Sequence, residues 1–206
     1  MNTLLQSVRP ALSLFVVLTA LTGVAYPLLV TGVAQAAFPH AANGSIVTVD
    51  GQAVGSTLIG QSFTAPQYFW SRPSATGPMP NNGVASGGSN FGANNAALTD
   101  AVKGRIEALR SADPAQTGPV PVDLVTTSAS GLDPDISLAA ALYQRPRVAR
   151  ARGIREQVVQ DLIDAQAHKP WLGVVGEPRV NVLTLNLALD GKAANRSTGT
   201  PLTPAR

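Results

Sequence analysis

The sequence contains no cysteine, only two histidines and almost no charge in its first quarter. Without cysteine, disulfide scaffolds, thiolate zinc sites and cysteine nucleophiles are excluded. The histidines, His40 and His168, form no HExxH zinc motif, and no GxSxG nucleophile elbow is present. Of the 15 basic and 12 acidic residues, only Arg9 precedes Asp50, which excludes an evenly patterned soluble domain.

An uncharged, apolar run extends from Ala11 to Gln35. Because roughly 20 apolar residues cross the hydrocarbon core of a bilayer, this run predicts a transmembrane helix. Pro27 lacks an amide hydrogen and is expected to kink that helix. The alternative is a cleaved secretory signal, since residues 34–36 have the small-x-small form of a cleavage site. The run exceeds the usual signal core of about 7 to 15 residues, which favours an uncleaved anchor.

The one early charge also predicts how the chain is oriented. Because Arg9 precedes the span, residues 1–10 are expected at the cytoplasmic face and the rest of the chain outside the cytoplasm. Residues 36–191 are long enough for one domain with its own core, and too short for two comfortable ones. The polar residues 192–206 are expected to form a flexible tail.

The pattern beyond the span predicts an α+β fold class, in which a single N-terminal transmembrane helix precedes one mixed helix/strand soluble domain. Asp50-Gly51 predicts a type I′ turn within a hairpin over residues 45–59. Leucines alternate over residues 178–190 as in a strand, yet Pro178 and Gly191 fit helix ends, and we favour a helix. The other expected elements are strands at 68–70 and 120–125, and helices over about 98–111, from Asp133-Pro134 onward, and over 154–168.

Glycine and asparagine are concentrated in residues 76–95, which predicts a long loop. Part of this loop has the small, polar composition of loops that bind phosphate through backbone amides, and resembles the SGG core of the transporter-ATPase signature. The GxxxxGK[ST] pattern is absent and the nearest lysine is Lys103, so a structural loop is the favoured interpretation. The phosphate-binding candidates are Ser86, Gly87, Gly88 and Ser89.

Five arginines fall within eleven residues with no acid between them: Arg145, Arg147, Arg150, Arg152 and Arg155. Such a run has the charge to bind phosphates, acidic lipid headgroups or an acidic partner, although a solvated or partner-paired helix face is the favoured interpretation. Nucleic acid is not an expected partner, because no aromatic residues are interleaved for base stacking.

Asp133 and Asp135 have the spacing of the first two ligands in a calcium-binding loop. The glycine and glutamate that complete that pattern are missing, so helix capping is the expected role of both carboxylates and no metal site is predicted.

Several segments, in order, match one known family. They are Tyr26-Pro27-Leu28 with Thr31-Gly32, Gly60-Gln61 with Phe63, residues 68–74 (YFWSRPS), 87–90 (GGSN), 122–126 (VDLVT), 128–134 (SASGLDP) and 144–153 (QRPRVARARG). These segments resemble the C subunit of the Kdp potassium-transporting P-type ATPase, the KdpC family, over roughly residues 20–190.

The resemblance implies a single-pass subunit of a bacterial inner-membrane complex. Its partners would be a channel-like potassium-binding subunit, a P-type ATP-hydrolysing subunit, a small stabilising peptide and membrane lipid. It also implies that this chain has no catalytic residues and no cofactor of its own.

Two roles are attached to the family: support of assembly from outside the cytoplasm, and a catalytic chaperone that promotes ATP binding by the ATP-hydrolysing subunit. In the second role the 86–89 loop or Gln144 would contact ATP shared with that subunit. Because ATP is cytoplasmic, the expected topology favours an effect transmitted indirectly through the helix. The alternative function is a cleaved or anchored extracytoplasmic binding module that recognises acidic ligands through the arginine run.

Overall fold

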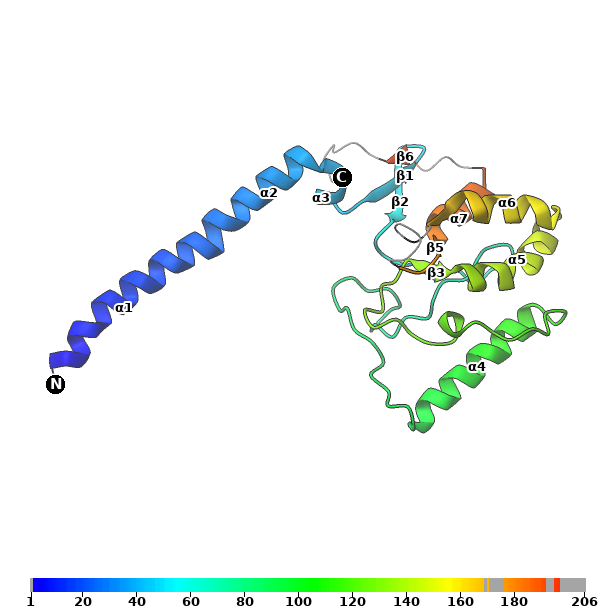
Figure 1. Cartoon of the computed structure of the whole chain (residues 1–206), viewed down its shortest axis with the longest axis horizontal. Helices are drawn as coiled ribbons and strands as arrows, with labels where there is room; N and C mark the ends of the chain where they lie inside the picture. The colour runs from blue at the N-terminus through cyan, green and yellow to red at the C-terminus, as the bar shows by residue number, and fades with distance from the viewer. Residues whose placement is uncertain (1, 169, 171–175, 192–194, 197–206) are drawn as a thin grey trace. The chain divides into compact units, whose positions relative to one another are not determined.

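The computed structural model describes residues 2–168, 170, 176–191 and 195–196. The chain divides into two compact units, one containing the residues up to Ser45 and the other spanning Ile46–Arg196. The first unit contains the N-terminal helices, and the second contains helices mixed with two small sheets (Figure 1). The α+β fold class with one N-terminal apolar helix is therefore confirmed.

The N-terminal unit is helical almost throughout. Helix α1 (Asn2–Ala20) continues through a π-helical turn, η1 (Leu21–Ala25), into α2 (Tyr26–Ala37), and α3 (Pro39–Ala42) follows. Over Ser7–Ala37 it is long and apolar enough to cross a membrane, and it is the only helix of this kind among the described residues.

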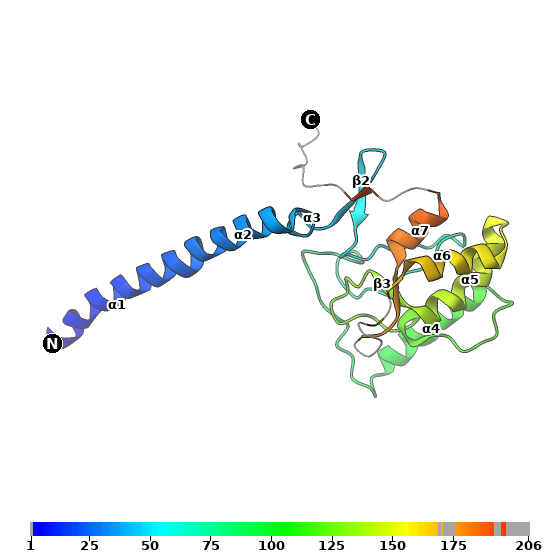
Figure 2. The same ribbon diagram turned by 45° about the horizontal axis from the view of Figure 1, so that its top comes forward.

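The helical ribbon runs without a break from α1 into α2, the helix that contains Pro27 (Figures 1 and 2). The irregularity that the proline was expected to cause takes the form of the π turn just before it, where the Tyr26 N–H donates to the Leu21 carbonyl five residues back. Widening the turn in this way accommodates the hydrogen bond that proline cannot make.

The predicted hairpin is confirmed. Strand β1 (Ile46–Val49) pairs antiparallel with β2 (Gln52–Ser56), and Asp50 and Gly51 have the positive φ angles, 51° and 78°, of a type I′ turn. The second strand ends at Ser56, three residues before the expected end. On its other side β1 pairs with β6 (Asn195–Arg196). Of the predicted tail, residues 192–194 and 197–206 lie outside the described part of the chain.

A second antiparallel sheet has the order β3-β5-β4, formed by β3 (Asp135–Ser137), β5 (Arg179–Asn181) and β4 (Ala167–His168). The helices of this domain are α4 (Ala96–Ala112), α5 (Leu138–Arg152), α6 (Glu156–Gln166) and α7 (Val182–Leu189), with a short 3₁₀ turn η2 (Val122–Leu124). Helix α4 confirms the segment expected over 98–111, and α6 confirms most of the segment expected over 154–168, whose last two residues form β4 instead. Residues 178–190 contain both a strand and a helix, where only a helix was expected.

Three expected elements are wrong. Residues 120–125 contain the turn η2 and no strand, because Pro119 and Pro121 supply no N–H to a ladder. No helix begins at Asp133-Pro134: the Pro134 carbonyl accepts from the Val182 N–H, and α5 begins later, capped by Ser137. Residues 68–70 form no strand.

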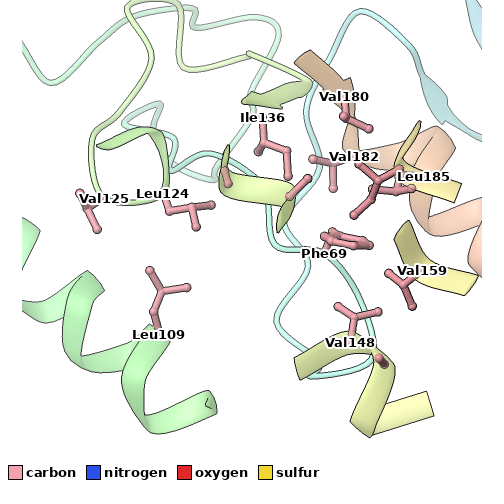
Figure 3. Close-up of a cluster of buried hydrophobic side chains, with 14 residues drawn as sticks. Phe69, Leu109, Leu124, Val125, Ile136, Val148, Val159, Val180, Val182 and Leu185 are labelled. Carbon is pink, nitrogen blue, oxygen red and sulfur yellow. The ribbon is translucent and has the colours of Figure 1, made fainter. Parts of the chain in front are cut away.

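Apolar side chains of the domain form two buried clusters, and α7 contributes to both. Val182 and Leu185 join the larger cluster around Phe69, whereas Leu183 and Leu187 join Val47 and Val49 of the hairpin. Figure 3 shows Phe69 among Val148, Val159, Val182 and Leu185, with Leu109 of α4 beside Leu124 and Val125. A helix apolar on both sides is one that is buried between two surfaces.

Candidate functional site

Segments that are far apart in the sequence meet around residues 128–133. The Gly60 N–H donates to the Leu132 carbonyl at 2.8 Å, and the Gly87 N–H donates to the Ser130 carbonyl at 2.8 Å. The Ser74 hydroxyl donates to the Gly131 carbonyl at 2.7 Å. The 128–133 segment is therefore the centre on which three loops converge.

Two glycines in this cluster stand where the backbone approaches closest. Gly131 has φ +67°, and a Cβ there would lie 2.6 Å from the Gly87 carbonyl oxygen. A Cβ on Gly60 would lie 2.6 Å from the Asp133 carbonyl oxygen. Both distances are shorter than real Cβ contacts, so only glycine lets these segments pack without a shift.

The sequence-predicted phosphate loop packs against this same segment. The Ser86 hydroxyl donates to the Ser130 carbonyl at 3.0 Å, and the Ser89 hydroxyl shares a 3.1 Å hydrogen bond with Thr127. A Cβ on Gly88 would lie 3.0 Å from the Ala129 carbonyl oxygen. With the Gly87 amide also bound, these contacts favour a structural role, and phosphate binding by residues 86–89 stays a prediction.

Gln144, the other nucleotide candidate, lies in the core with 1% of its surface exposed. Its Oε1 accepts from the Trp70 N–H at 2.8 Å, and its Nε2 donates to the Trp70 carbonyl at 3.1 Å. Asn186 of α7 does the same for Phe69, at 2.8 and 3.1 Å. Two side-chain amides thus satisfy residues 69–70 as a neighbouring strand would, which is why that segment needs no sheet partner.

The structure does not bring the two nucleotide candidates together. Gln144 binds Trp70, whereas the 86–89 loop binds residues 127–131, and no hydrogen bond between Gln144 and the loop occurs in the described part of the chain. Sequence reasoning missed Asn186, although a single amide in the leucine-rich run 182–189 is the signal of a buried polar contact.

The arginine run is used inside the domain. Arg147 is 4% exposed and donates to the carbonyls of Pro66 and Tyr68 at 2.6 and 3.1 Å, and its guanidinium lies 4.7 Å from the centre of the Trp70 ring. Burial lowers the pKa of Arg147 to about 10, so the group is still protonated at neutral pH.

Three more arginines of the run also have partners in the domain. Arg145 binds Gln160 and Glu156, and Arg150 binds the buried carboxylate of Asp113. Arg152 reaches the carbonyls of Gln67 and Leu189 and the carboxylate of Asp190. Arg155 is exposed. Four of the five arginines are therefore paired with groups of the same domain, which agrees with the favoured interpretation of a partner-paired helix face.

The two carboxylates at metal-loop spacing are both paired. Asp133 accepts from Arg72 at 3.0 Å and from the Asp135 N–H at 3.1 Å, and Asp135 binds Arg179 at 2.7 Å. The expected helix capping by these residues is wrong, since the cap of α5 is Ser137. Among the described residues, no three His, Cys, Asp or Glu side chains gather as metal ligands would.

The structure thus defines a chain with one N-terminal helix apolar enough to cross a membrane, followed by a folded α+β domain. The family described as "KdpC: K+-transporting ATPase, c chain" matches residues 8–191. The chain belongs to this family.

Curated relatives agree over nearly the whole chain. A protein of Janthinobacterium sp. (strain Marseille) is 63% identical over 182 residues, which is 88% of this chain and 96% of the relative. A protein of Polaromonas naphthalenivorans (strain CJ2) is 65% identical over 88% of this chain and 93% of its own length. A protein of Methylibium petroleiphilum is 62% identical over 93% of this chain and 99% of its own length. Each is named "Potassium-transporting ATPase KdpC subunit".

Proposed function

We propose that this chain is the non-catalytic accessory subunit of an ATP-driven potassium-uptake complex of the bacterial inner membrane. It assembles with a channel-like potassium-binding subunit, a P-type ATP-hydrolysing subunit and a small stabilising peptide. The proposal is carried by one observation beside family membership: a helix of 31 residues, Ser7–Ala37, whose most apolar stretch is fully exposed in the isolated chain. Such a surface is stable only in lipid or against other membrane helices.

In the proposed arrangement the N-terminus is cytoplasmic and the domain from Ile46 onward is extracytoplasmic. The support is the charge distribution, because Arg9 precedes the span and a long downstream domain is translocated largely irrespective of its charge. The domain supports assembly of the other subunits from that side.

The chain also promotes ATP binding by the ATP-hydrolysing subunit, and it does so indirectly. The groups offered for direct contact are already bound within the domain: the Gly87 amide by Ser130, and both amide atoms of Gln144 by Trp70. A nucleotide would have to displace these hydrogen bonds, each worth about 1 kcal/mol net. We therefore assign the effect to coupling through the membrane helix and the assembled complex.

Truncation tests the assembly role. In cells lacking the native chain, complexes are purified through a tag on the ATP-hydrolysing subunit, with either the full chain or residues 1–44 supplied. The full chain is expected to restore a stable complex and potassium-stimulated ATPase activity, and residues 1–44 are not. Normal complexes and transport with residues 1–44 would contradict the proposal. The mass of the purified full chain is the control for cleavage, since a chain starting at Ala37 would have lost its anchor.

Photo-crosslinking separates the indirect route from direct contact. Azido-ATP is expected to label the ATP-hydrolysing subunit, and removal of residues 45–206 is expected to weaken the apparent affinity of that subunit for ATP in membranes. Labelling at residues 86–89 or at Gln144 would show direct contact and would overturn the indirect route. Alanine at Ser86 and Ser89 leaves the apparent ATP affinity unchanged if the route is indirect.

Sidedness is measurable because the chain has no cysteine of its own. Val84 is 98% exposed in the 76–95 loop, so Val84→Cys offers a thiol that a membrane-impermeant maleimide can reach. In intact spheroplasts this variant is expected to be labelled from outside, whereas Asn2→Cys is expected to react only after lysis. The reverse pattern would contradict the proposed orientation.

A further inference from the structure

A cavity of about 300 Å³ lies in the α+β domain, beside helix α4. Its walls are mostly apolar, with Trp70, Leu109 and Leu124 among them, and they also include the guanidinium-bearing Arg105 and the hydroxyl-bearing Ser62 and Thr64. A pocket of this size is at the lower end of the range for small-molecule sites, which are typically apolar with a few polar groups that orient the ligand.

Arg105 differs from the other arginines of the domain core. It is half-buried, and the only hydrogen bond that it makes with the described residues is from Nη1 to the Val125 carbonyl at 2.7 Å. No carboxylate of the described residues lies within 4.0 Å of it. A guanidinium has five N–H donors, so most of those on Arg105 remain available.

The electrostatics of Arg105 agree with this geometry. Burial lowers its pKa, and no neighbouring acid acts in the opposite direction. Partial burial removes some of the water around this unpaired charge, which favours an anion that reaches it. Arg72 also lines the cavity, but its donors go to Asp133 and to the carbonyls of Thr126 and Thr127. The uncompensated charge at this cavity therefore belongs to Arg105.

Hydroxyl groups extend the polar side of the cavity. The Ser62 oxygen accepts from the Asn81 side chain at 3.3 Å, which leaves the Ser62 O–H to donate, and Thr64 makes no hydrogen bond within the described residues. A cavity whose walls include a guanidinium and two hydroxyl-bearing residues suits a phosphate, which has three strong acceptor oxygens and binds arginine in a bidentate manner.

We propose that this cavity binds a small phosphate ester with an aliphatic portion, the phosphate on Arg105 and the aliphatic part against Trp70, Leu109 and Leu124. This site is separate from the 86–89 loop and does not depend on the proposed role in the ATPase complex. A phospholipid headgroup with its adjoining acyl carbons and a soluble phosphate ester share this chemistry.

Trp70 provides the readout. The chain contains two tryptophans, so the Trp171→Phe variant keeps Trp70 as its only tryptophan. The full-length variant is placed in phosphatidylcholine nanodiscs for the measurement. Hexyl phosphate is expected to change the Trp70 emission in a saturable way. Hexanol and inorganic phosphate, which each carry half of the chemistry, are expected to bind at least about tenfold more weakly.

Matched variants then test each side of the cavity. Arg105→Gln is expected to weaken hexyl phosphate binding about tenfold, since it removes a charged hydrogen-bond donor. Arg110→Gln, an exposed change on the same helix that does not line the cavity, is expected to leave the affinity unchanged. Ala108→Leu fills the cavity without altering charge and is also expected to weaken binding, which keeps the test valid if Arg105→Gln unfolds.

Three results would overturn the proposal. They are no saturable change in Trp70 emission with hexyl phosphate, an affinity for hexanol or inorganic phosphate equal to that for hexyl phosphate, or a hexyl phosphate affinity in the Arg105→Gln and Ala108→Leu variants equal to that of the chain without them. A phosphatidylglycerol nanodisc distinguishes the sources. If lipid is the natural ligand, the Trp70 emission in the phosphatidylglycerol nanodisc is already shifted relative to phosphatidylcholine, and added hexyl phosphate causes no further change. If a soluble ester is the ligand, the titration is the same in both lipids, and either result supports the site.

Discussion

The N-terminal helix and the α+β domain satisfy their side chains in opposite ways. In the helix, large apolar groups such as Phe15 and Leu28 are 68% and 67% exposed, and only Arg9 is charged. In the domain, even Arg147 is 4% exposed and bound on several sides. The stability of the helix therefore depends on its surroundings, whereas the stability of the domain depends on hydrogen bonds among its own residues.

The sharpest test of this contrast is Gln144→Met, which keeps the side-chain volume and removes the amide. It leaves the Trp70 N–H and carbonyl without their partner in the core, so we expect the free energy of unfolding to fall by about 3 kcal/mol. Gln157→Met is the control, because Gln157 is exposed and, among the described residues, hydrogen-bonds through its side chain to Asp161 alone; its expected change is within about 0.5 kcal/mol. Urea unfolding of the full chain, followed by tryptophan emission, measures both.

A charge introduced into the helix tests the other half of the comparison, the dependence of the helix on lipid. Val24→Arg is expected to cost about 3 kcal/mol of membrane insertion, because arginine is poorly tolerated at the centre of a span. The same substitution at Val84, 98% exposed in the domain, should leave insertion unchanged. Carbonate extraction of membranes measures the inserted fraction. Equal extraction of the two variants would argue that the helix is not embedded in lipid.

Glycine substitutions compare a packed site of the domain with an open one. Gly131→Ala places a Cβ against the Gly87 carbonyl at a positive φ, and we expect a loss of about 2 kcal/mol in unfolding free energy. Gly104→Ala, in α4 with nothing within 4 Å of the new Cβ, should instead stabilise the domain by about 0.5 to 1 kcal/mol. Thermal melts of the two variants should shift in opposite directions.

The smallest expected effect concerns the ion pair between Arg72 and Asp133. The side chains of Arg72 and Asp133 are 28% and 30% exposed, so screening by solvent limits the contribution of the pair to stability. A double-mutant cycle with Arg72→Met and Asp133→Asn is expected to give a coupling energy below about 1 kcal/mol, and to decrease from 0.05 to 1 M salt. A larger, salt-independent coupling would place this pair among the buried contacts of the domain.

Local chemistry was predictable where short-range rules decide the outcome. The Asp50-Gly51 turn and helix α4 follow directly from the sequence, because turn geometry and a 3.6-residue period need no information about distant residues. The span over residues 11–35 also follows from composition alone, although the helix continues to Ala37. The mixture of helix and strand patterns beyond the span indicated the α+β fold class, and the resemblance indicated the family.

What the sequence did not reveal depends on contacts between distant segments. The leucines of 182–189 alternate like a strand because both sides of α7 are buried, and periodicity alone cannot distinguish that case. Gln144 and Arg147 looked available for ligands because nothing local shows that the 66–70 segment packs on them. The Arg105 cavity was missed for the same reason, since its walls come from five separate stretches of the chain.

The π turn at Leu21–Ala25 has a consequence for any helix that packs along the N-terminal segment. One extra residue in a turn rotates everything beyond it by about 100° relative to an unbroken α-helix. The face that carries Thr19 therefore continues at Pro27, eight residues on, instead of at Tyr26, seven residues on. A neighbouring helix with a simple heptad pattern fits one half of this segment or the other, and a partner that fits both halves must contain a matching shift in its own register.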